Sequence, residues 1–160
     1  MITKILVCID GSEKSQKTLD YALEVAEKFS ASIHLLNVFQ PPPEFGNQSN
    51  MFQPAVSGYS QEQTVYAANI VSFMKELRWI HETLLSEATD RATKLKPSLK
   101  ITSELKEGDS PSLIVETAVN GHFDLIIIGH KGDSKFNELF LGSTSERVAH
   151  QSKCAVLIVK

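Results

Sequence analysis

The sequence predicts an α/β fold: an open parallel sheet with helices on both of its faces. Short, continuous apolar runs alternate along the chain with longer segments whose apolar residues recur at helical spacing. An apolar run without polar alternation is typical of a strand that is buried on both faces. Alternation of such strands with helices implies right-handed crossovers between parallel neighbours. The 160 residues suit one domain, residues 1–160, on the usual scale of roughly 100–200 residues per domain.

The first strand and helix follow each other directly. The β-branched run Ile5-Leu6-Val7-Cys8-Ile9 predicts a strand that ends at Asp10-Gly11-Ser12. Ser12 is a favourable residue for the N-cap of a helix. The helix that follows should present an apolar stripe to the sheet, formed by Leu19, Ala22, Leu23, Ala26 and Phe29. Residues 33–39 predict the second strand.

Residues 40–60 differ in composition from the rest of the chain. They hold four of the six prolines and a single charged residue, Glu44, and they show no helical or strand period. A flexible surface loop is therefore expected at 40–60. Residues 62–95 then predict a long helix, which Pro97 ends. Within this helix Trp79 is interpreted as a core or interface residue.

The second half repeats the strand–helix rhythm. The turn Gly108-Asp109-Ser110-Pro111 precedes a predicted helix at 112–119, and Gly129 ends the next apolar run. The remaining elements are strands at 99–105, 123–128 and 155–159 and a helix that runs from the Gly142 region to about 151. Five strands and four helices fit the length of the chain.

Composition and motif searches exclude several classes of function. A net charge of −3 gives no broad basic footprint for nucleic acid or for an anionic membrane. No apolar run approaches a membrane span of about 18 residues, and residues 1–4 open directly into a strand rather than a signal peptide. Cys8 and Cys154 sit in apolar runs and are interpreted as small buried residues of a reducing, cytoplasmic compartment.

No catalytic or metal-binding arrangement is recognisable in the sequence. The five histidines show no metal spacing, and no Gly-Lys dipeptide of a P-loop and no Gly-x-Ser-x-Gly elbow occur. The expected site therefore contains no catalytic residue and no protein metal ligands.

One glycine pattern carries a chemical signal. It reads Gly129-His130-Lys131-Gly132, nine residues, then Gly142-Ser143-Thr144. Glycines let the backbone approach a bulky anion closely. A helix that begins near Ser143 would direct its free N–H groups and positive dipole end at a phosphate. Lys131 or His130 could add charge, and the hydroxyls of Ser143 and Thr144 add donors.

Two simpler interpretations stand beside this one. Ser143 and Glu146 also fit a capping box, in which they satisfy the free N–H groups of the helix without a ligand. Asp10, at the end of the first strand, is either a ligand group or the side chain of an Asx turn that caps the first helix. The residues alone leave both alternatives open.

The complete spacing resembles the nucleotide-binding signature of the universal stress proteins. The resemblance extends over nearly the whole chain, from the opening strand with its Asp-Gly-Ser turn, through Gly108–Pro111 and Asp124–Gly129, to the last strand at 154–159. It implies a Rossmann-like sheet in the order 3-2-1-4-5 that binds ATP, or ADP or AMP. Mg²⁺ or Mn²⁺ would be held through phosphate oxygens.

The same resemblance assigns positions around the nucleotide. Asp10 would lie near the adenine or ribose, and Val38 would offer backbone contacts to adenine. The remaining nucleotide-binding positions would surround the ribose and phosphates: Gly129, Gly132, Gly142, Ser143 and Thr144. Lys131 is a candidate from the residues alone, because family members vary at positions 130 and 131 and the resemblance assigns them no role.

Three functions are consistent with these features of the sequence. The first is an ATP-binding regulatory module of the stress response with at most slow ATP hydrolysis. The second is an enzyme that hydrolyses or transfers part of a nucleotide, and the third is an interaction dimer of the same fold that binds no nucleotide. The regulatory partner protein stays unidentified.

The last strand also predicts an assembly. A continuous apolar strand at the chain end would be a sheet edge, and an exposed edge has to be paired or protected. In the family that the sequence resembles, this strand pairs with its copy across a two-fold axis. A homodimer through residues 154–159 is therefore expected.

Overall fold

The computed structural model describes residues 1–41, 61–130 and 141–160. The expected loop at 40–60 lies almost wholly outside them. In chain order the elements are β1 Lys4–Cys8, α1 Glu13–Phe29, β2 Ser32–Phe39, α3 Gln61–Leu95, β3 Ile101–Glu107, α4 Ser110–Asn120, β4 Leu125–Gly129, α5 Ser143–Gln151 and β5 Ala155–Val159. The five strands form one parallel sheet in the order β3-β2-β1-β4-β5. The predicted fold class and strand order are confirmed.

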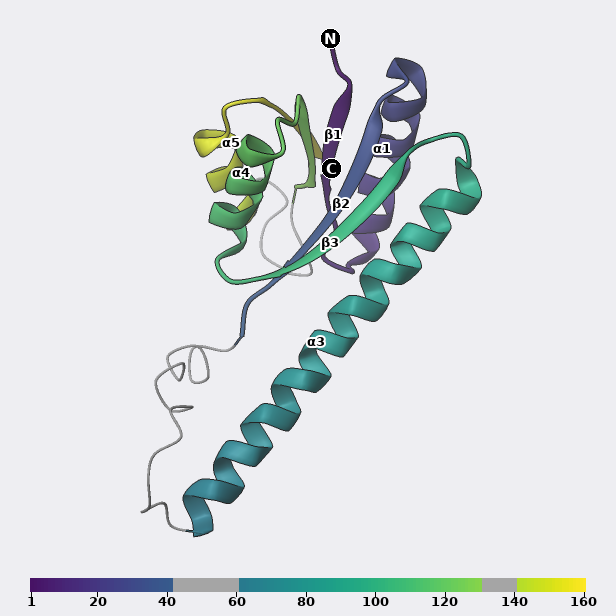
Figure 1. The fold of residues 1–160 in the computed structure, drawn as a ribbon. Helices are drawn as coiled ribbons and strands as arrows, with labels where there is room; N and C mark the ends of the chain where they lie inside the picture. The colour runs from purple at the N-terminus through teal and green to yellow at the C-terminus, as the bar shows by residue number, and fades with distance from the viewer. Residues whose placement is uncertain (42–60, 131–140) are drawn as a thin grey trace.

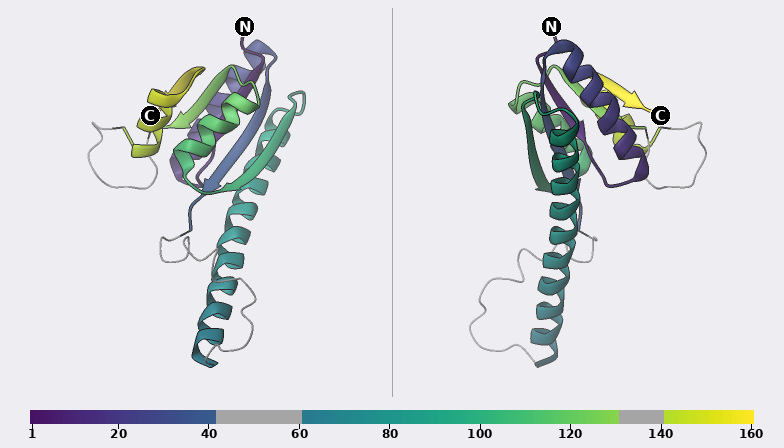
Figure 2. Two further views of the ribbon diagram at one scale, coloured as in Figure 1. Left: turned by 60° about the vertical axis from the view of Figure 1, so that its left-hand side comes forward. Right: turned by 90° about the vertical axis from the view of Figure 1, so that its right-hand side faces the viewer.

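Helices cover both faces of the sheet, α1 and α3 on one and α4 and α5 on the other (Figures 1 and 2). Successive strand residues point to opposite faces, so β1 contributes Val7 to the core under α1 and Leu6 to the core under α4 and α5, and both side chains are fully buried. The continuous apolar run of β1 is therefore a strand buried on both faces, as predicted.

Strand β4 begins at Leu125 rather than at residue 123, and the starts of α4 and β3 differ from the predicted ones for local reasons. Helix α4 begins at Ser110, because the Asp109 side chain accepts a hydrogen bond from the Ser112 amide and so caps the helix two residues early. Strand β3 begins at Ile101 rather than at residue 99, because the Leu99 amide bonds the Lys96 carbonyl in a turn that follows α3.

Helix α3 extends well beyond the sheet (Figure 1). Trp79 lies on this helix and is 64% exposed, so its interpretation as a core residue is wrong, and the interface alternative stays a prediction. Phe29 is also largely exposed, because it occupies the last turn of α1 beyond the sheet-facing stripe that Leu19, Ala22 and Leu23 form.

A single carboxylate fastens the start of β1. The Oδ2 atom of Asp124 accepts hydrogen bonds from the Thr3 amide at 2.7 Å, the Thr3 hydroxyl at 2.8 Å and the Lys4 amide at 3.0 Å. The bond from the Thr3 amide is the largest of the contributions that hold the pKa of Asp124 below its ordinary value of 3.8. The carboxylate therefore stabilises the fold while it is ionised.

Asp124→Asn should be less stable than the wild type at pH 7, and this difference should shrink in acid. A carboxyl whose folded pKa is depressed contributes stability above its unfolded pKa, and that contribution is lost as the pH falls through the lower folded value. Urea unfolding of both proteins between pH 7 and pH 3 measures the difference. Asp90→Asn, at an exposed position of α3, is the control; a gap that stays constant down to pH 3 would contradict the assignment.

Candidate functional site

A cavity of about 310 Å³ opens at the carboxyl ends of β1 and β4. These two strands are neighbours in the sheet, and the chain leaves them in opposite directions, toward β2 on one side and β5 on the other. Ligands of open α/β sheets bind in the crevice at such a reversal of strand order. The cavity is lined by Cys8, Ile9, Asp10, Ser12, Ser15, Leu36, Val38, Ser110, Ile114, Ile128, Gly129, Gly142, Ser143, Thr144 and Ser145.

Three helices begin at this cavity, and only α5 begins without a side-chain cap. In α1 the Ser12 hydroxyl accepts from the Ser15 amide, and in α4 Asp109 plays the same part. The N-cap of α5 is Gly142, which has no side chain to offer. Within the described ranges no group accepts a hydrogen bond from the amides of Ser143, Thr144 or Ser145. These amides and the positive end of the α5 dipole suit an anion.

The capping-box interpretation of this helix start is wrong. In a capping box the serine occupies the N-cap and the glutamate stands three residues later. Here the helix starts at Ser143, so the N-cap falls one residue earlier, on Gly142. Glu146 instead donates its amide to the Gly142 carbonyl at 2.9 Å as the first helical bond. Among the residues that the structure describes, no side chain therefore caps this helix start.

The start of α5 is tied to the sheet through His130. The His130 amide donates to the Val159 carbonyl at 2.7 Å. Its carbonyl accepts from the Gly142 amide at 2.8 Å and from the buried Ser145 hydroxyl at 2.9 Å. The first amides of α5 are thus held at a fixed place beside the ends of β4 and β5.

Asp10 forms the predicted Asx turn and also lines the cavity. Its Oδ1 atom accepts from the Ser12 amide at 3.0 Å and from the Ser12 hydroxyl at 2.7 Å, which confirms the Asx turn. The residue is also exposed and lines the cavity. The turn therefore holds the carboxyl at the rim, where contact with a ligand stays a prediction.

The structure brings together most of the residues singled out from the sequence. Asp10, Val38, Gly129, Gly142, Ser143 and Thr144 all line the same cavity. Lys131 and Gly132 lie outside the described residues.

Several lining residues were not predicted, among them Ser15, Ser110 and Cys8. Ser110 follows β3, and two strands, β2 and β1, lie between β3 and the strand β4 at which the glycine pattern begins, so only the folded sheet brings Ser110 close. Cys8 ends β1, and its sequence signal was that of a core residue. Burial, and to a smaller extent the nearby Asp10 carboxylate, raise the pKa of the Cys8 thiol to about 12.

A buried polar link connects α3 to this end of the sheet. The fully buried Asn37 donates its side-chain amide to the Ile9 carbonyl at 2.6 Å and accepts from His81 of α3 at 2.9 Å. The His81 ring also stacks on Phe39 with centroids 5.0 Å apart, and burial lowers the pKa of His81. The long helix is thereby anchored beneath Ile9, which lines the cavity.

An ion pair joins the two helices on the other side of the cavity. Arg147 of α5 places both terminal nitrogens 3.2 Å from the two carboxylate oxygens of Asp109 at the start of α4. The Ser112 hydroxyl and, after it, Arg147 lower the pKa of Asp109 by hydrogen bonding to its ionised form. The ion pair fixes the spacing between the two helix starts that border the cavity.

Neither a cluster of metal ligands nor a membrane-spanning helix occurs in the part of the chain that the structure describes. No three histidine, cysteine, aspartate or glutamate side chains in the described ranges gather in a way that suits a metal ion. None of the helices there combines the length and apolar character that crossing a membrane requires.

Comparison with known proteins agrees with this architecture. The family model described as "Universal stress protein family" matches residues 1–160. The chain is 28% identical over 162 residues to the universal stress protein YxiE of Bacillus subtilis, with complete coverage of both chains.

Two solved structures have the same fold. One is a universal stress protein in complex with cAMP, at 26% identity and a TM-score of 0.63, with 99% of this chain and 97% of that chain covered. The other is the universal stress protein from Archaeoglobus fulgidus in complex with dAMP, at 16% identity and a TM-score of 0.59, with 100% and 98% covered. With a family match that spans its whole length, the chain belongs to the universal stress protein family.

Proposed function

We propose that this protein binds an adenine nucleotide, with ATP as the preferred ligand, in the cavity at the ends of β1 and β4. The start of α5 carries the proposal. None of the described residues accepts a hydrogen bond from its first three amides, at Ser143–Ser145, and these residues line the cavity, whereas side chains cap the other two helix starts. A phosphate group would satisfy these amides and the helix dipole together. The hydroxyls of Ser143 and Thr144 add further donors at the same place.

The remaining lining suits the rest of such a ligand. Val38 and Ile114 offer apolar surface for a base, and Asp10 stands at the rim within the same cavity. The family relatives in complex with cAMP and dAMP support an adenine nucleotide over other phosphate esters. Mg²⁺ or Mn²⁺ would enter with the nucleotide and contact its phosphates, as divalent ions usually do.

We propose that binding, rather than turnover, is the function, so that the protein acts as a nucleotide-dependent regulatory module in the stress response. The described lining consists of backbone amides, hydroxyls, apolar side chains and the Asp10 carboxyl. Its thiol, Cys8, has a pKa of about 12 and is a poor nucleophile at neutral pH. Slow hydrolysis by a loosely held water is compatible with this lining.

ATP with Mg²⁺ should raise the thermal unfolding temperature of the nucleotide-free protein. Ligand at about 100 times its dissociation constant adds roughly 2.7 kcal/mol. For a domain of this size the shift should be on the order of 5–10 °C, at about 2–4 °C per kcal/mol. Mass spectrometry of the denatured sample first establishes that no nucleotide is already bound. GTP is the control for base recognition, and no shift with ATP in nucleotide-free protein would contradict the proposal.

We further propose a homodimer through β5 and a cytoplasmic location. Within the described structure β5 pairs only with β4, so its outer edge is open. Leu157 is 37% exposed on this strand, and an open apolar edge favours pairing with a second copy. Both cysteines are free, as is usual in a reducing compartment.

A further inference from the structure

A second cavity, of about 470 Å³, lies away from the α5 helix start, between the sheet and the C-terminal end of α4. It is bordered by the starts of β1 and β2, by the length of β3 and by the turn after α4. None of its lining residues lines the first cavity. Its volume falls within the range of roughly 300–1,000 Å³ that small-molecule sites occupy.

Strand β3 gives this cavity a polar wall. The register places Thr102 beside His34, Glu104 beside Leu36 and Lys106 beside Val38. Because side chains alternate along a strand, Thr102, Glu104 and Lys106 all point to the face that α4 and α5 cover further along the sheet. Parallel sheets normally bury apolar residues on both faces. On this face of β3, an edge strand, three alternate positions are polar; Thr102 and Glu104 are exposed and Lys106 is half-buried.

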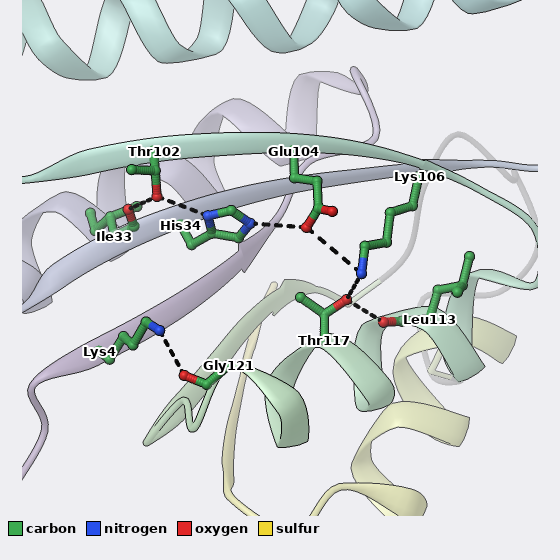
Figure 3. Close-up of polar contacts among 9 residues, drawn as sticks. All are labelled: Lys4, Ile33, His34, Thr102, Glu104, Lys106, Leu113, Thr117 and Gly121. Carbon is green, nitrogen blue, oxygen red and sulfur yellow. Dashed lines mark hydrogen bonds and ion pairs between the residues drawn. The ribbon is translucent and has the colours of Figure 1, made fainter.

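The polar groups form one connected network across the cavity (Figure 3). His34 Nδ1 lies 2.8 Å from Thr102 Oγ1, and His34 Nε2 lies 3.5 Å from the carboxylate of Glu104. The Lys106 ammonium lies 3.7 Å from Glu104 and donates to the Thr117 hydroxyl of α4 at 2.9 Å.

Lys4 approaches from the opposite wall of the cavity. Its ammonium donates to the Gly121 carbonyl at 2.6 Å and lies 4.5 Å from the centre of the Phe123 ring. Lys4 is half-buried, and the Lys106 side chain is only 25% exposed. Both ammonium groups therefore lie at the lining of the same cavity.

The charges of the lining do not balance. Three lysines, Lys4, Lys100 and Lys106, face a single carboxylate, Glu104, which leaves two positive charges in a chain whose net charge is −3. Burial lowers the pKa of His34, which also faces Lys4, Lys106 and Glu104, so the imidazole is neutral near pH 7. A ligand with two negative charges would neutralise the cavity.

We propose that this cavity is a second ligand site, independent of the nucleotide cavity, and that it takes a small organic dianion such as a phosphate monoester. Lys4 and Lys106 would bind the anionic group with charge-assisted hydrogen bonds. The hydroxyls of Thr102 and Thr117 and the neutral face of His34 would contact the uncharged part of the ligand. Glu104 opposes binding and so selects for a ligand with more than one negative charge.

Titration of ¹⁵N-labelled protein with phenyl phosphate tests the site. Saturable shifts are expected for the backbone amides of Lys4, His34, Thr102 and Gly121. Lys106→Gln should weaken binding roughly tenfold or more, because a charge-assisted hydrogen bond is lost. Glu104→Gln should tighten binding severalfold, since it removes the opposing charge. Lys94→Gln, at an exposed position of α3, should change nothing.

Further readouts separate the site from simpler explanations. Bound phenyl phosphate should raise the pKa of His34, followed through its ring signals, because an anion favours the imidazolium form. Shifts confined to Ser143–Ser145 would place the ligand at α5 instead. Equal effects of Lys106→Gln and Lys94→Gln, or no saturation up to ~10 mM, where a millimolar site would be largely filled, would overturn the proposal. Unchanged thermal unfolding of each variant shows that the fold is intact.

Discussion

Replacing Gly142 by aspartate is expected to stabilise the ligand-free protein slightly and to weaken ATP binding by roughly 10- to 100-fold. Gly142 has φ −65° and ψ 149°, close to the backbone of the capping residue Ser12 at φ −67° and ψ 159°. An aspartate there can therefore cap α5, which is worth a few tenths of a kcal/mol relative to glycine. Its carboxylate would occupy the amides that the phosphate needs and would repel the phosphate charge.

The opposite signs of the two effects make the test informative. Thermal unfolding of the ligand-free variant measures the gain in stability, and calorimetric titration with ATP and Mg²⁺ measures the loss of affinity. Gly142→Asn is the matched control, because asparagine caps a helix about as well as aspartate but carries no charge. It should lose less affinity than Gly142→Asp. Unchanged ATP affinity in a stabilised Gly142→Asp variant would place the phosphates away from α5.

The fold was predictable because its strands carry the pattern of a fully buried parallel sheet. Ile5, Leu6 and Val7 are all fully buried, and a run without polar alternation indicates such a strand directly. The order of the strands was not contained in the local pattern, and it came from the resemblance to a family. The prediction of Trp79 as a core residue was wrong because helical spacing shows only which residues share a face of a helix. It does not show that α3 extends beyond the sheet.

Only the part of the candidate site that comes from one continuous segment of the sequence was predictable. The spacing from Gly129 to Gly142 identified the end of β4 and the start of α5, which the structure places at one cavity. Ser110 and Ser15 come from other helix starts, and their approach depends on sheet order. Asn37 was hidden for a different reason. A single asparagine in an apolar strand gives no sign that it will bond both Ile9 and a histidine 44 residues away.

No pattern in the sequence predicted the second cavity. Thr102, Glu104 and Lys106 alternate with less polar neighbours, which is the ordinary pattern of an edge strand with one solvated face. Lys4 belongs to a different strand and is far from Lys106 in the sequence. The sequence therefore does not indicate that both side chains point to α4. Only the register of β1, β2 and β3 reveals that these charges share one space.

A second substitution with a large expected effect lies at the open edge of β5, the proposed dimer interface. Val156 and Ile158 pack against the core under α4 and α5, whereas Leu157 is 37% exposed on the outer strand. A charged residue at 156 would therefore disturb the monomer itself. Leu157 is the better position, because its side chain is available to a partner and contributes less to the core of its own chain.

Leu157→Glu is expected to convert a dimer into a monomer. In a two-fold symmetric interface each substitution occurs twice near the axis, so two carboxylates replace two apolar side chains. Like charges in such proximity cost several kcal/mol, which weakens association by roughly 100-fold or more. Light scattering coupled to size exclusion measures the mass. Ala68→Glu, which adds the same charge at an exposed position of α3, should stay dimeric. A monomeric wild type, or a Leu157→Glu variant that remains a dimer, would show that β5 is not the interface.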